Sequence, residues 1–502
     1  MKNSSTPVLL GFVFLAMLFG SAVAILGGLV PVVAALVLLL VVLTLTDFRI
    51  GVLILIFLVP FQKTVWLPSF TGFNLINYFT VTTLAAVVAN RLFRGIPVAR
   101  FPRYMVWFYV VPILLATAYG ARSVGQAPHY FLAIVESYET VRKYAMDLTV
   151  RPMMTVLLAW MLGTAVLNSR NPERFLIPVM LAPILIALPA LGLVAWSGFD
   201  LGFLSSSSIA ARQAMNRVGL HANTLGPLLA TGLTLQVFVL PKLTGAIGRS
   251  FLLAGMSLTA VVLALTFSRG GYLIAAIGVF AFLIDQRKIR YLFYAVLALG
   301  LVAVPFGEAM FDRVSTGFGG GASSMPFSTS QPDALTAGRV MIWMNLLPDV
   351  LRSPLWGSGV GSIAWSRAVT SGLVMVGHPH NLYLHILMDM GVIGLAMMLY
   401  VFWKMYFSFR HWATLSGMPP ALVAAFKGAS AGFIGLLVNG FTNGYYIYDE
   451  QQLCIWLMFG IGLAYLPLRG PKPSKNTALV SGSILPSVTA LNAGTPTYRA
   501  LK

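Results

Sequence analysis

The most constraining feature of this chain is a succession of long apolar runs that contain almost no charge. Charged residues make up 9% of the 502 residues and apolar residues 58%, and the mean hydropathy is +0.84. A soluble globular protein has roughly 25% charged residues, so this chain cannot cover a water-exposed surface. The sequence therefore predicts an all-α, polytopic transmembrane helical bundle. It excludes a secreted enzyme, a disordered chain and a nucleic-acid-binding domain.

Runs of about 20 apolar residues are long enough to cross the hydrocarbon core of a bilayer. The first run is interpreted as a retained span, because no small-residue cleavage site followed by a polar segment is evident. A shorter run, Ile50–Phe61, is the weakest candidate, and whether it is a full span stays open. The prediction is 12–14 spans. With the weak candidate they lie near 8–27, 29–46, 50–61, 74–90, 104–119, 152–168, 175–196, 222–240, 250–267, 271–285, 290–306, 388–403, 428–443 and 452–468.

The formal net charge of +19 is explained by orientation in a membrane. With the C-terminal tail in the cytoplasm, alternation of the fourteen spans puts 21 of the 33 Lys and Arg in cytoplasmic segments. Only three of the 14 Asp and Glu fall there. Short cytoplasmic loops of membrane proteins carry excess Lys and Arg. The sequence therefore predicts a multi-pass membrane protein with its C-terminus in the cytoplasm.

Two outer segments are longer than simple connections. Residues 120–151 have the pattern of an interfacial amphipathic helix. Residues 307–387 form a large loop on the outer face with a predicted helix from Ala337 to Val350, and loops of this length are usually functional. The predicted organisation is a membrane domain over residues 1–468, which includes this loop, and a disordered cytoplasmic tail over 469–502.

Scarce charges at one membrane face are the candidate functional residues. Arg217 precedes a span, Arg269 lies in a two-glycine turn, and Arg339 opens the loop helix. Glycines beside Arg269 allow a ligand to approach the backbone, and Ser268 adds a donor. Each arginine has a simpler interpretation: Arg269 could contact lipid phosphate or cap a helix, and the other two could be solvated. Guanidinium groups gathered on one face suit an anionic lipid-linked substrate such as a pyrophosphate.

A histidine accompanies these arginines where the long loop returns to the membrane. His380 is suited to take a proton from a hydroxyl, although a helix-entry histidine bonded to backbone is the alternative. His378 and His380 have no carboxylate nearby on their segment, and zinc usually needs three or four ligands. No metal site and no cofactor are therefore predicted. Cys454 is the only cysteine, so a disulfide within the chain is excluded.

Four motifs, in order, resemble segments of the O-antigen ligase and polymerase family, polytopic glycosyltransferases of the bacterial inner membrane. The strongest is His380-Asn381 followed after nine residues by Gly391 and then Gly394, which is similar to the ligases' His-Asn-x9-Gly-x-x-Gly pattern. The others are Phe267-Ser-Arg-Gly-Gly271, Gly338-Arg339 with Trp343, and Leu355-Trp-Gly-Ser-Gly-Val-Gly361. The resemblance covers residues 200–400 and otherwise rests on hydropathy.

The resemblance implies metal-independent transfer from an undecaprenyl-pyrophosphate-linked glycan on the periplasmic face. By motif position, Arg269 and Arg339 correspond to the pyrophosphate-binding pair, His380 to the catalytic base, and Arg217 to a further donor-binding residue. Ser268, Asn381 and Tyr383 are expected to support them. We expect an inverting displacement at the anomeric carbon, with the lipid tail of the donor in a groove between spans.

Several functions remain open at this stage. An O-antigen ligase transfers a finished glycan to lipid A-core, whereas a polymerase uses the same donor to extend a growing lipid-linked glycan. A protein O-oligosaccharyltransferase is a variant of this chemistry. A lipid-linked glycan transporter is the non-enzymatic alternative, but a transporter would be expected to carry charge or broken helices at mid-membrane. The charges here gather at one face, which favours an enzyme, and a ligase is the first expectation.

Overall fold

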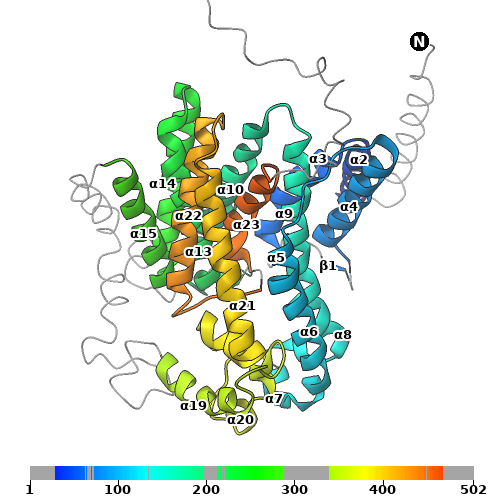
Figure 1. The fold of residues 1–502 in the computed structure, drawn as a ribbon, viewed down its shortest axis with the longest axis vertical. Helices are drawn as coiled ribbons and strands as arrows, with labels where there is room; N and C mark the ends of the chain where they lie inside the picture. Colours follow the sequence, from blue (N-terminus) through cyan, green and yellow to red (C-terminus); the bar gives the residue numbers. More distant parts are fainter. Residues whose placement is uncertain are drawn as a thin grey trace, which may run out of the picture. The chain divides into compact units, whose positions relative to one another are not determined.

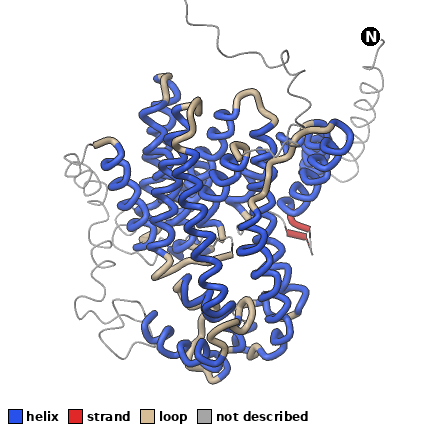
Figure 2. Tube along the Cα trace, in the orientation of Figure 1, coloured by secondary structure: helices blue, strands red, loops and turns tan. Residues whose placement is uncertain are grey.

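The computed structural model describes residues 29–196, 212–287 and 338–466, apart from positions 63, 65–68, 71–72, 134, 214, 218, 220 and 448. The predicted spans 8–27 and 290–306, residues 307–337 of the long loop and the tail 469–502 lie outside the described residues. The regular secondary structure of the described chain is helical apart from a short antiparallel pairing of β1 (Ser69–Phe70) with β2 (Phe73–Asn74) (Figure 2). The prediction of an all-α fold is confirmed.

The helices of the described chain follow one another as labelled in Figure 1. They are α2 (Leu29–Thr46), α3 (Phe48–Leu58), α4 (Leu75–Arg94), α5 (Arg103–Met105), α6 (Val111–Gly120), α7 (His129–Leu132), α8 (Val141–Ala145), α9 (Arg151–Leu167), α10 (Leu176–Trp196), α13 (Ala222–Val239), α14 (Ala246–Leu265), α15 (Arg269–Asp285), α19 (Arg339–Arg352), α20 (Arg367–Thr370), α21 (Leu382–Trp412), α22 (Pro420–Asn439) and α23 (Leu453–Leu463). Two π-helical segments, Val106–Val110 and Met146–Val150, join α5 to α6 and α8 to α9.

Eight helical stretches of the described chain are long and apolar enough to cross a membrane. They are Leu75–Arg94, Arg103–Gln126, Val141–Leu167, Pro172–Val194, Ala222–Lys242, Ala246–Leu265, Leu382–Trp412 and Pro420–Asn439, and each contains one of the predicted spans or most of it. The predicted spans near 29–46, 50–61, 271–285 and 452–468 also fall on helices, which are not among these eight. The weak candidate is part of an apolar helical stretch, Phe48–Phe61, that is shorter than a full span.

Small residues allow the helices to pack closely. Helix α13 lies against α15 and α22, and α23 lies against α9. A Cβ atom at Gly460 on α23 would lie 2.5 Å from the carbonyl oxygen of Ala159 on α9, and a Cβ at Gly163 would lie 2.7 Å from the Gly460 carbonyl oxygen. Close backbone approach of this kind favours helix association in a bilayer, where apolar side chains gain nothing by leaving lipid. Any larger residue at Gly460 would push these two helices apart.

Residues 120–151 do not form the amphipathic helix that was expected. Pro128 and Thr140 each precede a new helical start, and α8 continues through a π-helical segment into α9. The aromatic residues of this segment are part of the interior, because Tyr138 and Tyr144 are 3% and 0% exposed and both contact the ring of Trp365. Internal packing, rather than a membrane surface, explains the apolar face of this sequence.

The long loop returns to the bundle at a break in α21. The predicted loop helix is present as α19, which begins after Gly338. Figure 1 shows α19 and α20 beside the first turns of α21. Within α21, Gly391 has φ 64° and ψ −167°, and a Cβ there would lie 2.3 Å from the carbonyl oxygen of Leu355. Only glycine fits both this backbone conformation and this contact, which explains Gly391 in the sequence motif.

Candidate functional site

Arg269 and Arg339 line the same cavity, although 70 positions separate them in the sequence. Arg212 is a third guanidinium on its wall, and the described residues that line it include no carboxylate. Polar uncharged side chains complete the wall: Asn223, Ser268, Asn439, Thr442 and Asn443. This cationic cavity encloses about 410 Å³, including its open mouth. Its composition suits a phosphate or pyrophosphate group, which guanidinium donors can bind in a bidentate manner.

The turn between α14 and α15 places Arg269. Ser268 caps α15, because its hydroxyl accepts a hydrogen bond from the Gly271 amide at 3.2 Å. Phe267 is fully buried with φ 48°, which fixes the direction of the chain before the cap. Arg269 is thus the first residue of α15, at a helix N-terminus whose dipole favours an anion. Ser268, which the sequence suggested as a supporting residue, both caps the helix and lines the cavity.

Asn439 is a buried residue of this wall whose side-chain amide is available to bind a ligand. The residue is 1% exposed, and neither Nδ2 nor Oδ1 has a hydrogen-bond partner among the described residues. A Cβ atom at Gly270 would lie 2.1 Å from Asn439 Oδ1, so the glycine makes room for the amide beside Arg269. Burying an unsatisfied amide costs roughly 1–3 kcal/mol. A ligand in the cavity would recover part of this cost by bonding to the amide.

His380 lies near Arg339 and at hydrogen-bonding distance of Asn443, which is part of the same wall. Burial lowers the pKa of His380 to about 4, with further lowering by the charges of Arg339 and His221 and an opposing effect of Asn443. The imidazole is therefore neutral at pH 7. Its buried Nδ1 has no hydrogen-bond partner among the described residues. This side chain can accept a proton beside the guanidinium groups.

A hydrogen-bonded turn holds His380 in place. The residue has φ 51°, its amide donates to His378 Nδ1 at 3.1 Å, and the two imidazole ring centroids are 3.9 Å apart. The preceding carbonyl, of Pro379, accepts a hydrogen bond from Trp343 Nε1 at 2.8 Å. Because Trp343 is one helical turn after Arg339 on α19, this bond fixes the helix that carries the arginine against the turn that carries the histidine.

Asn381 and Tyr383 support this turn from α21. Asn381 caps the helix by accepting from the amides of Tyr383 and Leu384, both at 3.0 Å. The Tyr383 hydroxyl donates to the Leu437 carbonyl on α22 at 2.8 Å. Neither residue lines the cationic cavity, so their contacts fit the positioning of His380 rather than direct contact with a donor.

Arg217 is not brought to this cavity. Its side chain is exposed in a turn before α13, whereas Arg212, five positions earlier, lines the wall and donates from Nη2 to Asn223 Oδ1 at 3.0 Å. Sequence reasoning also missed Asn439 and Asn443. Two asparagines at the end of an apolar span were the available signal for them, but only the packing of α22 against α15 shows that they face the arginines.

Asp389 explains the glycine-rich motif of the long loop. This fully buried carboxylate on α21 accepts hydrogen bonds from the amides of Gly361 and Ser362, each at 3.0 Å, and from the Ser362 hydroxyl at 2.7 Å. It also accepts from the Tyr446 hydroxyl at 2.7 Å. These bonds join three parts of the chain: the long loop, α21 and the segment after α22. Asp389 was not among the predicted site residues.

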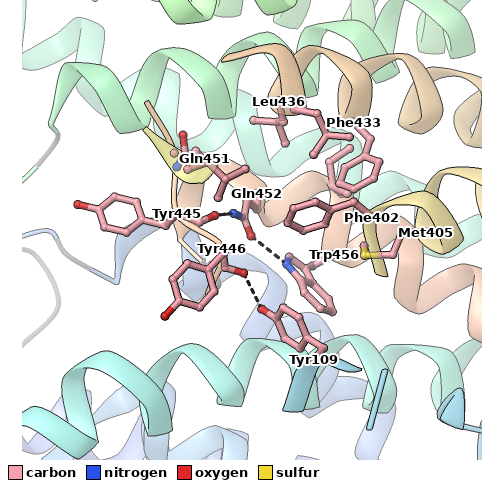
Figure 3. Close-up of a pocket in the computed structure, with 14 residues that line it drawn as sticks. Tyr109, Phe402, Met405, Phe433, Leu436, Tyr445, Tyr446, Gln451, Gln452 and Trp456 are labelled. Atoms are coloured by element: carbon pink, nitrogen blue, oxygen red, sulfur yellow. Dashed lines mark hydrogen bonds between the residues drawn. The ribbon is translucent and has the colours of Figure 1, made fainter. Parts of the chain in front are cut away.

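An apolar cavity of about 520 Å³, including its open mouth, lies between α21, α22 and α23. Its lining includes Phe402, Met405 and Trp456, and the backbone of Tyr445 and Tyr446 closes one side (Figure 3). The Tyr109 hydroxyl donates to the Tyr446 carbonyl at 3.2 Å, which fixes this segment against the bundle. In Figure 3 the rings of Tyr445 and Tyr446 project away from Trp456.

No group of three or more His, Cys, Asp and Glu side chains in the described part of the chain is arranged to hold a metal ion. The fold defines a multi-pass α-helical membrane protein whose described residues form a cationic cavity. Residues 254–399 match the family model described as O-antigen ligase. This match bears out the predicted resemblance over the part of the chain that contains the four motifs.

The match supports a membrane enzyme of the glycosyltransferase type that acts, in general terms, on lipid-linked glycans. The match includes Arg269, Arg339 and His380, whereas Arg212, Asn439 and Asn443 lie outside it. A comparison with curated proteins and a comparison with solved structures each gave no match.

Proposed function

We propose that this protein transfers a glycan from an undecaprenyl-pyrophosphate donor to an acceptor hydroxyl, and that the acceptor belongs to lipid A-core, as in an O-antigen ligase. The observation that carries the proposal is the cationic cavity: Arg212, Arg269 and Arg339 surround it together with the buried amide of Asn439. A pyrophosphate ester supplies the negative charge that the described residues of this wall lack.

In the proposed reaction, the acceptor oxygen attacks the anomeric carbon of the donor sugar from the face opposite the pyrophosphate. The bond from that carbon to the phosphate oxygen breaks as the new C–O bond forms, so the configuration inverts. His380 takes the hydroxyl proton, and the electron pair of the broken bond leaves on undecaprenyl pyrophosphate. Guanidinium groups held in place before the reaction stabilise the charge that develops on the leaving group.

The neutral state of His380 fits this role. A histidine protonated at pH 7 beside Arg339 could not accept a proton, whereas its lowered pKa keeps the imidazole neutral in the substrate-free protein. A bound pyrophosphate adds negative charge beside the ring, which raises the pKa toward the range where a base is efficient. General base catalysis of this kind contributes roughly 10²–10⁴ in rate. The role needs no metal ion.

The orientation derived from Lys and Arg completes the proposal. The cavity faces the periplasm of a bacterial inner membrane, the C-terminus lies in the cytoplasm, and the lipid tail of the donor stays in the bilayer. A repeat-unit polymerase is the second candidate, because the family match fits either acceptor. A protein O-oligosaccharyltransferase would use the same donor site.

Gene deletion with analysis of surface polysaccharides tests the proposal and separates the two candidates. Loss of all long glycan from lipid A-core, restored by the wild-type gene, is expected for a ligase. A core with a single repeat unit would indicate a polymerase. Normal lipopolysaccharide and normal exopolysaccharide would contradict both. Purified protein in liposomes should release undecaprenyl pyrophosphate from the donor only when acceptor is present, whereas donor movement across the bilayer without cleavage would indicate a transporter.

A further inference from the structure

A second cavity, larger and of opposite charge, reaches the histidine turn. It encloses about 1330 Å³, including its open mouth, and His378 is part of its wall. Four carboxylates line this acidic cavity, those of Asp147, Asp389, Asp449 and Glu450, and Arg151 is the one guanidinium among its described lining residues.

The carboxylates of the acidic cavity have different roles. Asp147 forms an ion pair with Arg151 at 2.7 Å. Asp389 accepts hydrogen bonds from the amides of Gly361 and Ser362 in the long loop. Asp449 and Glu450 are 5% and 6% exposed and come from the segment before α23. Among the described lining residues, carboxylates therefore outnumber guanidinium groups. A buried carboxylate accepts strong hydrogen bonds from hydroxyl or ammonium donors, but it opposes a phosphate or another carboxylate.

The wall of the acidic cavity also contains a buried histidine whose ring nitrogen is available to bind a ligand. His385 is 8% exposed, and its Nε2 lies 3.3 Å from Asp389 Oδ2. Its Nδ1 is buried and has no hydrogen-bond partner among the described residues. The ring of Tyr445 lies at a tilted angle beside that of His378, with centroids 4.7 Å apart. A ligand with several hydroxyl groups and an apolar face would fit these carboxylates, nitrogens and rings.

His378 and His380 connect the walls of the two charged cavities, because their ring centroids are 3.9 Å apart. His378 lines the acidic cavity, and His380 lies beside Arg339 of the cationic cavity. We infer that the acidic cavity binds the acceptor sugar that carries the attacking hydroxyl, and that this sugar is uncharged or cationic. The inference rests on the proposed function. The pyrophosphate is bound on one side of the histidine turn and the acceptor sugar on the other, so the hydroxyl reaches His380 from the acidic side.

Separate kinetic constants for donor and acceptor test this inference. Full-length protein in liposomes is assayed with lipid-linked glycan and lipid A-core, both extracted from cells that lack the protein. In the double variant Asp449→Asn/Glu450→Gln, the KM for acceptor should rise at least about tenfold and the KM for donor should stay within about twofold. Glu173→Gln, an exposed carboxylate outside the cavity, is the matched control and should change neither constant.

A steric variant covers the case in which the double variant does not fold. Ser137 lines the cavity and is half-buried, so Ser137→Phe should fill space and raise the acceptor KM alone while leaving both carboxylates in place. Unchanged acceptor KM in the variants that fold, or a donor KM that rises in step with it, would overturn the inference. Failure of wild-type protein to transfer glycan at all would refute the proposed function instead, and the inference with it.

The charge of the acceptor sugar is tested with two small competitors on wild-type protein. Glucosamine should inhibit competitively against acceptor, and glucose 6-phosphate at the same concentration should inhibit at least about tenfold more weakly, because its phosphate meets Asp449 and Glu450. Competition by glucose 6-phosphate that equals or exceeds that of glucosamine, or no competition by glucosamine, would overturn the charge assignment.

Discussion

Trp343 donates a hydrogen bond from its indole Nε1 to the carbonyl oxygen of Pro379 at 2.8 Å. The bond spans 36 positions and joins α19, which begins with Arg339, to the turn that ends in His380. A helix whose first residue is half-exposed would otherwise be free to shift relative to the imidazole. This contact therefore sets the geometry between Arg339 and His380, which are the proposed leaving-group ligand and the proposed base.

Trp343→Phe removes this donor and keeps most of the aromatic packing. We expect kcat to fall about 10- to 100-fold, since a displacement near 1 Å can cost about 10² in rate. Thermal stability should change little, because one hydrogen bond contributes about 1 kcal/mol. Initial-rate kinetics and melting curves measure both effects. Trp356→Phe is the matched control, because Trp356 is 72% exposed on the same loop. Equal activity of the two variants would show that the bond has no positioning role.

Arg339→Ala should abolish transfer, because the leaving group loses one of the guanidinium groups that stabilise it. Arg269→Lys should also fail if a bidentate contact is needed, since an ammonium cannot reproduce the guanidinium geometry. Transfer in vitro and protein abundance in membranes are the measurements. Arg352→Ala, an exposed arginine at the other end of α19, should keep activity. Near-wild-type transfer by Arg339→Ala would contradict the role of this residue.

Protonation of His380 should set the acid limb of the pH–rate profile. Its pKa in the substrate-free protein is about 4, below the ordinary value of 6.5, so the neutral base persists down to that pH. We expect the acid limb of kcat/KM near pH 4. The limb of kcat should lie higher, because bound pyrophosphate raises the pKa. His380→Gln should lose about 10²–10⁴ in kcat and the limb with it. His411→Gln, exposed on α21, is the control.

Folding must be followed across the same pH range. A histidine whose pKa is lower in the folded than in the unfolded protein contributes stability that is fully present above pH 6.5 and declines as the pH falls toward 4. Melting curves at each pH separate this loss from a loss of catalysis. An acid limb of kcat/KM at pH 6.5 in folded protein would mean that His380 is not held neutral by its surroundings.

Apolar runs and isolated charges in the sequence were sufficient to predict the membrane fold and to identify three residues of the candidate site. Apolar run length identifies helices such as α13 and α22, because a bilayer requires about 20 apolar residues whatever the neighbouring helices are. Arg269, Arg339 and His380 stood out because a charge or an imidazole is costly beside lipid. The structure places the first two in one cavity and the third beside Arg339.

Other features depend on contacts that no local pattern contains. Arg212 and Arg217 are alike in sequence, and only the fold after residue 211 directs Arg212 to the cavity and Arg217 to the surface. Asp389 lies in an apolar helix, and its partners come from the loop and from Tyr446, 57 positions away. The sequence pattern around Tyr138 suggested a membrane surface, whereas its ring contacts Trp365 in the interior. Periodicity shows that a helix face is apolar, but it does not show whether lipid or another side chain covers that face.

Asn439→Leu tests whether the cationic cavity is built for a ligand at a cost in stability. The two side chains are similar in volume, and the substitution removes a buried amide that has no hydrogen-bond partner among the described residues. An unsatisfied buried amide costs roughly 1–3 kcal/mol, so the melting temperature of substrate-free protein should rise or stay unchanged. The KM for donor should rise about 10-fold or more, since the leucine cannot bond to a pyrophosphate oxygen. Ser430→Ala on the same helix is the control, because the Ser430 hydroxyl bonds only within its own turn. A large loss of stability in Asn439→Leu would mean that the amide supports the fold, and unchanged donor KM would exclude it from the donor site.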